Sequence, residues 1–138
     1  MNFLLDTNAV SEWVKPRPNP GLIGWMESAD EDRVFLSVVS FAELRYGVDR
    51  MADGARRSRL ELWLRDELPL RFEGRILPVD HLVAEAWGRT VSRCEALGRP
   101  IGAMDAFLSA IADVHRLMLV TRNVSDFPTL KTVLNPWS

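Results

Sequence analysis

The chain is poor in the residues that define several common classes of protein. Its 138 residues include one cysteine, Cys94, and two histidines, His81 and His115. Cys94 has no internal disulfide partner and falls in a helical pattern, which indicates a small buried hydrophobe in a reducing compartment. A zinc site is disfavoured because the two histidines fall on separate predicted helices and the cysteine has no companion.

Long apolar runs and targeting segments are also missing. No stretch approaches the roughly 18 consecutive apolar residues of a membrane span, and residues 1–6 lack the basic start and cleavage site of a signal peptide. Hydrophobic residues make up 47% of the chain and charged residues 26%, which is typical of a globular protein. We expect a single domain over residues 1–138, located in the cytoplasm and without a membrane partner.

The charge balance does not reveal a partner. The formal net charge is −2, and of the 17 basic residues only Lys15 and Lys131 are lysines. Arginine makes planar, bidentate contacts with phosphate, but a genome rich in G and C would produce the same bias without functional meaning. The cluster of Arg56, Arg57 and Arg59 likewise does not by itself indicate a phosphate site, because charge runs usually line a solvated helix face.

Short apolar segments alternate with segments of helical periodicity. Strands are expected at residues 2–6, 34–37, 76–79, 118–121 and 133–136, the last at a sheet edge. Helices are expected at 7–14, 22–28, 40–51, 55–68, 81–97 and 101–115, with caps at Thr7 or Asn8, Ser40 and Asp80, and stops at Pro69 and Gly98. This alternation predicts a three-layer α/β/α sandwich around a mostly parallel sheet. Ligands of such sheets bind beyond the carboxyl ends of the strands.

Four acids fall at the boundaries of these elements. Asp6 ends the first strand, Glu43 lies in the first turn of the helix that Ser40 opens, Asp105 begins the helix before the fourth strand, and Asp126 follows that strand. If the four converge, their mutual repulsion raises their pKa values, and a divalent cation relieves the conflict. An all-oxygen site suits Mg²⁺ or Mn²⁺, which can activate water and clamp a scissile phosphate.

Each acid, taken alone, also has a structural alternative. Ser40 and Glu43 have the spacing of a capping box. Asp105 could favour the positive end of a helix dipole, and Asp126 could initiate a turn. Asp6 is harder to explain structurally, because an acid against a buried strand is costly without partners.

Four motifs in order resemble the PIN-domain family, in particular the VapC-type toxins of prokaryotic toxin–antitoxin pairs. They are Leu5-Asp6-Thr7-Asn8, Ser40-x-x-Glu43-Leu44-x-x-Gly47, Pro100-Ile-Gly-Ala-Met-Asp105 and Thr121-Arg122-Asn123-x-x-Asp126-Phe127. The resemblance implies a catalytic set of Asp6, Glu43, Asp105 and Asp126, supported by Asn8, Thr121 and Asn123. It implies Asp6 and Asp105 as metal ligands, with Glu43 and Asp126 at a second site or acting through water.

The same resemblance implies a reaction and partners. The reaction is hydrolysis of RNA phosphodiester bonds by an activated water with Mg²⁺, or Mn²⁺ as a substitute. The implied partners are an RNA substrate, a small antitoxin protein and a second copy of the chain in a homodimer. Operator DNA is implied as a partner only of the toxin–antitoxin complex.

Two other functions remain alternatives at the level of sequence. A phosphatase of the haloacid dehalogenase type also begins with an acid after its first strand, but it requires a second acid where this chain has Asn8. It also requires a lysine where the nearby basic residue is Arg122. The second alternative is a catalytically inert PIN-like binding module, against which the presence of all four acids argues.

Overall fold

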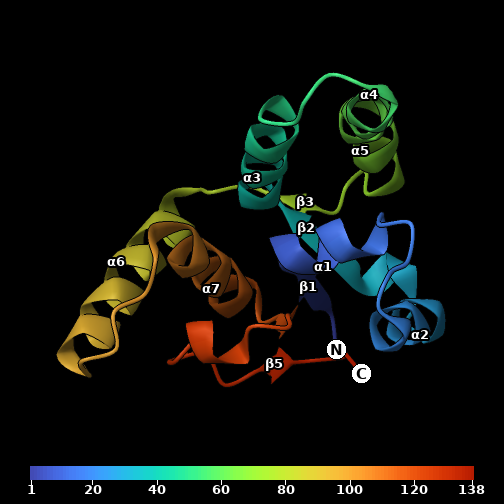
Figure 1. The fold of residues 1–138 in the computed structure, drawn as a ribbon. Helices are drawn as coiled ribbons and strands as arrows, with labels where there is room; N and C mark the ends of the chain where they lie inside the picture. The colour runs from blue at the N-terminus through green and yellow to red at the C-terminus, as the bar shows by residue number, and fades with distance from the viewer.

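Five short parallel strands form the centre of the molecule, which is described over residues 1–138 in a computed structural model (Figure 1). The strands are β1 (Phe3–Leu5), β2 (Val34–Ser37), β3 (Ile76–Leu77), β4 (Met118–Val120) and β5 (Val133–Leu134). Their order across the sheet is β3-β2-β1-β4-β5, and every neighbouring pair is parallel. The predicted edge position of the last strand is confirmed.

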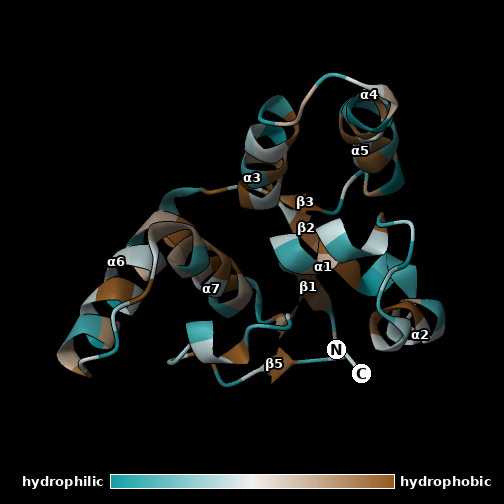
Figure 2. Ribbon diagram, viewed as in Figure 1, coloured by the Kyte–Doolittle hydropathy of each residue, from teal (hydrophilic) through white to brown (hydrophobic).

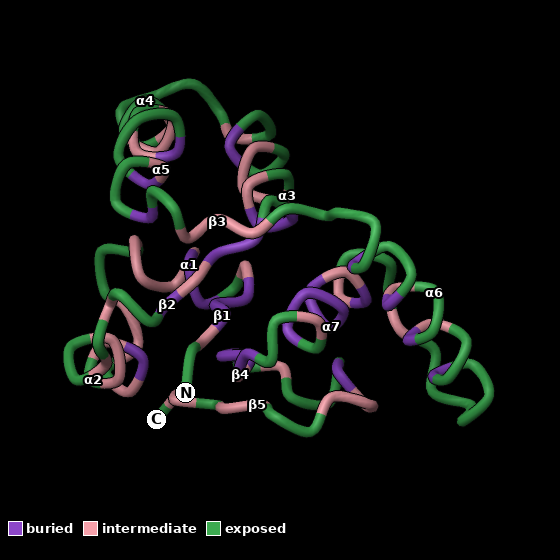
Figure 3. The backbone as a smooth tube through the Cα atoms, turned by 180° about the vertical axis from the view of Figure 1, so that it is seen from behind, coloured by how far each residue is buried: buried purple, intermediate pink, exposed green.

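Both faces of the sheet are buried, because successive side chains of a strand point to opposite faces. Leu4 and Leu119 belong to one hydrophobic cluster, whereas Leu5 and Val120 belong to a second. The strands are accordingly apolar along their length (Figure 2). Burial is concentrated on β1, β2 and β4 and on parts of the helices that cover them, whereas the edge strands β3 and β5 are intermediate (Figure 3). Continuous apolar strands are the expected pattern of a parallel sheet that is covered on both sides.

Helices cover the two faces and give the three layers that the alternation predicts. α6 (His81–Ala96) and α7 (Ala103–His115) pack on the face of Leu4. α1 (Thr7–Trp13) and α2 (Pro20–Ser28) pack on the face of Leu5. α3 (Val38–Asp49) reaches both clusters, because it buries Val39 in the first and Val48 in the second. None of the helices is long and apolar enough to cross a membrane.

The predicted stop at Pro69 is wrong. α4 (Ala55–Leu62) continues through a π-helical turn (Trp63–Glu67) into α5 (Leu68–Arg71). In this turn the backbone N–H of Leu68 donates to the carbonyl of Trp63, five residues earlier. Because proline has no N–H and its ring collides with the preceding turn of an α-helix, the wider turn before it lets the chain remain helical.

α2 begins at Pro20 and α7 at Ala103, where residues 22 and 101 were expected. The caps of α1 and α3 also differ from the sequence prediction, whereas two boundaries of α6 agree with it. α1 is capped by the side chain of Asp6, which accepts from the N–H of Ala9, and not by Thr7 or Asn8. α3 begins two residues before Ser40 and is capped by Ser37. For α6, the cap at Asp80 is confirmed. The stop at Gly98 is confirmed too: its φ of 69° is one that glycine adopts without strain.

Candidate active site

The site begins at the point where the order of the sheet reverses. The chain passes from the central strand β1 to β2 on one side, and β4 pairs with β1 on the other. Asp6 follows β1 and Thr121 follows β4, and the hydroxyl of Thr121 donates to Asp6 Oδ2. A switch point of this kind is where open α/β sheets bind their ligands.

Asp6 is buried, with 3% of its surface exposed, but both carboxylate oxygens are bonded. Oδ1 accepts the backbone N–H of Ala9 at 2.7 Å, and Oδ2 accepts the hydroxyl of Thr121. Burial raises the pKa of Asp6, while the hydrogen bonds from Thr121 and Ala9 oppose that rise and the charge of Glu43 adds to it. Asp6 therefore caps a helix and also presents a fixed carboxylate at the edge of the sheet.

Glu43 lies on α3, and its carboxylate is held by a residue of α1. It lies in the second turn of α3, and its Oε1 accepts the hydroxyl of Thr7 at 2.6 Å. The Oγ of Ser40 lies 2.9 Å from the Oγ1 of Thr7. The capping-box alternative for Ser40 and Glu43 is wrong, because α3 starts earlier and the Glu43 carboxylate is bonded to α1.

Asp105 lies in the first turn of α7, as predicted, and is half-buried. Its pKa is raised from 3.8 to about 6, first by burial and then by the negative charges of Asp126, Glu43 and Asp6. A helix N-terminus by itself favours a carboxylate. Burial and the three neighbouring acids act on the Asp105 carboxyl in the opposite direction, toward its neutral form.

The remaining predicted residues differ in how closely they join the site. Asp126 ends a 3₁₀ turn (Val124–Asp126) and is exposed, yet its charge is the largest acidic influence on Asp105. Asn123 contributes its backbone N–H to Thr121 Oγ1 at 3.0 Å. Asn8 is exposed, and its backbone N–H contributes to the environment of Asp6.

Thr7 and Ser40 are site residues that the sequence analysis treated only as helix caps. Thr7 directly follows Asp6, and its hydroxyl bonds to Ser40 and to Glu43, which lies 36 residues further along the chain. The available signal was the position of Thr7 directly after the acid that ends β1. Nothing in the sequence indicated which distant side chain that hydroxyl would meet.

The donor types at this edge fit a hard divalent cation, since carboxylate oxygens are the ligands that Mg²⁺ and Mn²⁺ prefer. The carboxylate of Asp105 has none of its oxygens engaged in an ion pair, whereas Asp6 and Glu43 are each oriented by a hydroxyl. No three side chains among histidine, cysteine, aspartate and glutamate are grouped closely enough to hold one ion together. The four acids therefore share an electrostatic field without forming a closed metal cage.

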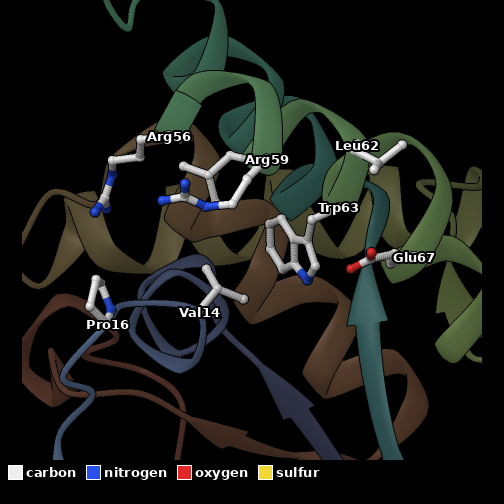
Figure 4. A pocket seen from close by; sticks show the side chains of 8 residues that line it. Val14, Pro16, Arg56, Arg59, Leu62, Trp63 and Glu67 are labelled. Atoms are coloured by element: carbon white, nitrogen blue, oxygen red, sulfur yellow. The ribbon is translucent and has the colours of Figure 1, made fainter. Parts of the chain in front are cut away.

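Two adjoining cavities lead away from Glu43. The inner cavity, of about 210 Å³, is lined by Thr7 and Glu43 among others, and the outer, of about 280 Å³, is lined by Arg59 and Pro16 among others. Figure 4 shows the outer cavity, with Arg56, Arg59 and Trp63 opposite Val14 and Pro16. The residues that line both cavities are Val14, Arg56, Leu60 and Trp63. The two cavities thus form one continuous groove between α1, α3 and α4.

These features define the class of the protein: a three-layer α/β domain with a parallel sheet and, around its switch point, an acid, Asp105, that feels the charges of three others. The family model of the PIN domain matches residues 3–130. The chain therefore belongs to the PIN domain family, and the resemblance inferred from the four motifs is confirmed.

Individual relatives span nearly the whole chain. It is similar to Toxin FitB of Neisseria gonorrhoeae, with 36% identity over 136 residues that cover 98% of each protein. It is also similar to the VapC ribonuclease Y4jK of Sinorhizobium fredii, with 31% identity over 98% of this chain and 97% of the relative. Among solved structures, a chain of FitAB bound to an IR36 DNA fragment matches with a TM-score of 0.92 and 34% identity, over 99% of this chain and 96% of the other.

Proposed function

We propose that this protein is an endoribonuclease that acts as the toxin of a toxin–antitoxin pair, and that it hydrolyses RNA phosphodiester bonds with the aid of Mg²⁺ or Mn²⁺. The observation that carries the proposal is the gathering of acids at the switch point, where burial and then the charges of Asp126, Glu43 and Asp6 raise the pKa of Asp105 to about 6. Strongly perturbed carboxyl groups in a cleft are typical of catalytic sites. The relative named as a VapC ribonuclease supports the same activity.

The chain's own residues have distinct tasks in this reaction. Asp6 and Asp105 would hold the cation, with Glu43 and Asp126 at a second ion or acting through water. A bound cation supplies an activated water and neutralises charge on the scissile phosphate. Thr121 and the N–H of Ala9 fix the orientation of the Asp6 carboxylate.

The partners follow from the same relatives. Solved structures similar to this chain are FitAB with DNA and the FitAcB complex of Neisseria gonorrhoeae. We propose a small antitoxin that blocks the groove and the acids, with operator DNA bound only by the toxin–antitoxin complex. We also propose a homodimer, and sedimentation that gives a monomer at micromolar concentration would contradict that assembly.

The alternatives have less support. Membership of the PIN domain family leaves the dehalogenase-type phosphatase without a structural basis. An inert binding module would have no reason to gather four acids whose repulsion costs folding free energy. Ribonuclease activity therefore explains why the fold keeps four acids together despite their repulsion.

The decisive experiment is an RNA-cleavage assay on protein freed of any antitoxin. The wild type is expected to cleave structured RNA in Mn²⁺ and to stop in EDTA. Asp105→Asn is expected to lose activity by a factor on the order of 100 or more, because it removes a ligand charge. Asp113→Asn, an exposed position in the same helix, is the matched control and should cleave like the wild type. Wild-type protein that degrades no RNA with metal supplied would leave the inert module as the better explanation.

A further inference from the structure

Three neighbouring arginines on α4 have different environments. Arg56 and Arg59 are exposed and form no ion pair within 4.0 Å. Arg57, between them, is half-buried and donates to Asp53 Oδ1 at 3.2 Å and to the carbonyl of Met51 at 3.0 Å. Residues three apart share a helix face. Arg56 and Arg59 therefore form an uncompensated basic pair, whereas Arg57 is used within the fold.

The basic pair lies on the groove that reaches Glu43. Arg56 lines both cavities, and Arg59 lines the outer one. The inner cavity also contains Glu43, which Thr7 holds at 2.6 Å. The groove thus connects two free guanidinium groups, which Figure 4 shows on the outer cavity, with the carboxylate of Glu43 at its inner end.

The lining of this groove suits a polymer that carries both charged groups and planar rings. Val14, Leu60 and the ring of Trp63 line both cavities and provide apolar surface. An unpaired base can stack on an aromatic ring, whereas a duplex keeps its bases inside. Lys15 lines the inner cavity but is paired with Glu12 at 3.0 Å, and Glu67 lines the outer one. The free positive charge of the groove is therefore that of Arg56 and Arg59.

We infer that this groove binds single-stranded RNA, with Arg56 and Arg59 contacting phosphates and with bases against Trp63, and that it leads the strand to the acids. The inference rests on the proposed ribonuclease function. A polyanion must approach four acids on a protein whose net charge is −2, so local cations are needed to offset the repulsion. Phosphate contacts fix the register of a nucleic acid on a protein and carry no base specificity.

The test measures how a fluorescent single-stranded RNA of mixed sequence binds in the Asp105→Asn background, where the probe stays intact. Each phosphate contact on a single strand contributes about 0.7 to the slope of log affinity against log salt. Arg56→Ala with Arg59→Ala is expected to lower that slope by about 1.4 and to weaken binding about tenfold or more at low salt. Replacing both arginines by lysine should keep most of the slope, because the charges remain.

Arg57→Ala is the matched control, since it removes an arginine of the same helix that is paired within the fold. It should leave the slope unchanged, with a melting curve to confirm folding. Equal slopes and affinities for the wild type and the double alanine variant would overturn the inference. Unchanged RNA binding together with lost inhibition by the antitoxin would also overturn it, and would assign the groove to a protein. Absent cleavage by the wild type in Mn²⁺ is a separate result, which counts against the ribonuclease function.

Discussion

The hydroxyl of Thr7 donates to Glu43 Oε1 at 2.6 Å and so joins the start of α1 to the second turn of α3. Thr7 has one hydroxyl hydrogen, and it is used in this bond. Ser40, whose Oγ lies 2.9 Å from the Thr7 Oγ1, must therefore be the donor to Thr7. Two hydroxyls in series hold the glutamate carboxylate, and the inner one, Ser40, is fully buried.

This relay predicts that Thr7 positions Glu43 for the reaction. Thr7→Val keeps the shape of the side chain but removes the donor. A hydrogen bond to a charged group contributes about 1.5–3 kcal/mol, so kcat is expected to fall roughly tenfold to a hundredfold. The KM for RNA should change little, because Arg56, Arg59 and Trp63, the residues proposed to bind the strand, are unchanged. The measurement is steady-state cleavage of RNA in Mn²⁺.

Thr7→Ser is the control for this prediction. It keeps the hydroxyl and should retain most of the wild-type kcat. If Thr7→Val and Thr7→Ser have the same kcat, the bond to Glu43 has no part in catalysis.

The placement of the strands and the position of Asp6 could be predicted from sequence, for a physical reason. Apolar runs of three to five residues between amphipathic helices indicate buried parallel strands, and a parallel sheet brings its carboxyl ends to one edge. An acid directly after such a run must lie at that edge. Asp6 and Asp105 are accordingly where the sequence analysis expected them.

The contacts of Thr7 and the course of α4 could not be predicted, because they depend on tertiary packing. Ser37 and Ser40 are both acceptable caps, and only the end of β2 decides that α3 begins after Ser37. Pro69 normally stops a helix, but the π turn before it depends on how α4 and α5 fit the sheet. Local propensity gives way to such packing.

The raised pKa of Asp105 predicts how stability depends on pH in metal-free protein. Its folded pKa of about 6 lies above the unfolded value of 3.8. The neutral acid is thus favoured by folding, and this contribution is fully present below the unfolded pKa and is lost as pH rises through about 6. The wild type should lose stability relative to Asp105→Asn between about pH 4 and about pH 7 and change little above that.

Thermal melts in EDTA across this range measure the effect. The difference in Tm between Asp105→Asn and the wild type should grow with pH. A constant difference would contradict the raised pKa, because asparagine does not titrate.

The C-terminal segment predicts opposite effects for two glycines of α2. A Cβ on Gly21 would lie 2.3 Å from the carbonyl oxygen of Pro136 and 2.6 Å from the backbone nitrogen of Ser138. A Cβ on Gly24 would meet nothing within 4 Å. Gly24→Ala is expected to stabilise the protein by about 0.5–1 kcal/mol. Gly21→Ala should destabilise it by about 1–3 kcal/mol, as overpacking does.

Urea unfolding of the two variants measures this difference. The backbone of the C-terminal segment cannot yield without losing the bonds that Ser138 makes to Asn19 and Gly21. If both variants are stabilised equally, the C-terminal segment does not pack on α2 in solution.

Metal binding predicts a gain in stability that depends on the carboxylates of the site. A cation that binds only the folded state stabilises it by RT ln(1 + [L]/Kd), which is about 2.7 kcal/mol at a hundred times Kd. Mn²⁺ should therefore raise the Tm of the wild type, and calorimetric titration should detect its binding.

Asp6→Asn keeps an oxygen for the N–H of Ala9, so the cap of α1 remains while the ligand charge is lost. This variant should fold without responding to Mn²⁺, whereas Asp113→Asn should respond like the wild type. Binding to Asp6→Asn with wild-type affinity would place the cation elsewhere, because removing one of few carboxylate ligands weakens a hard-ion site strongly.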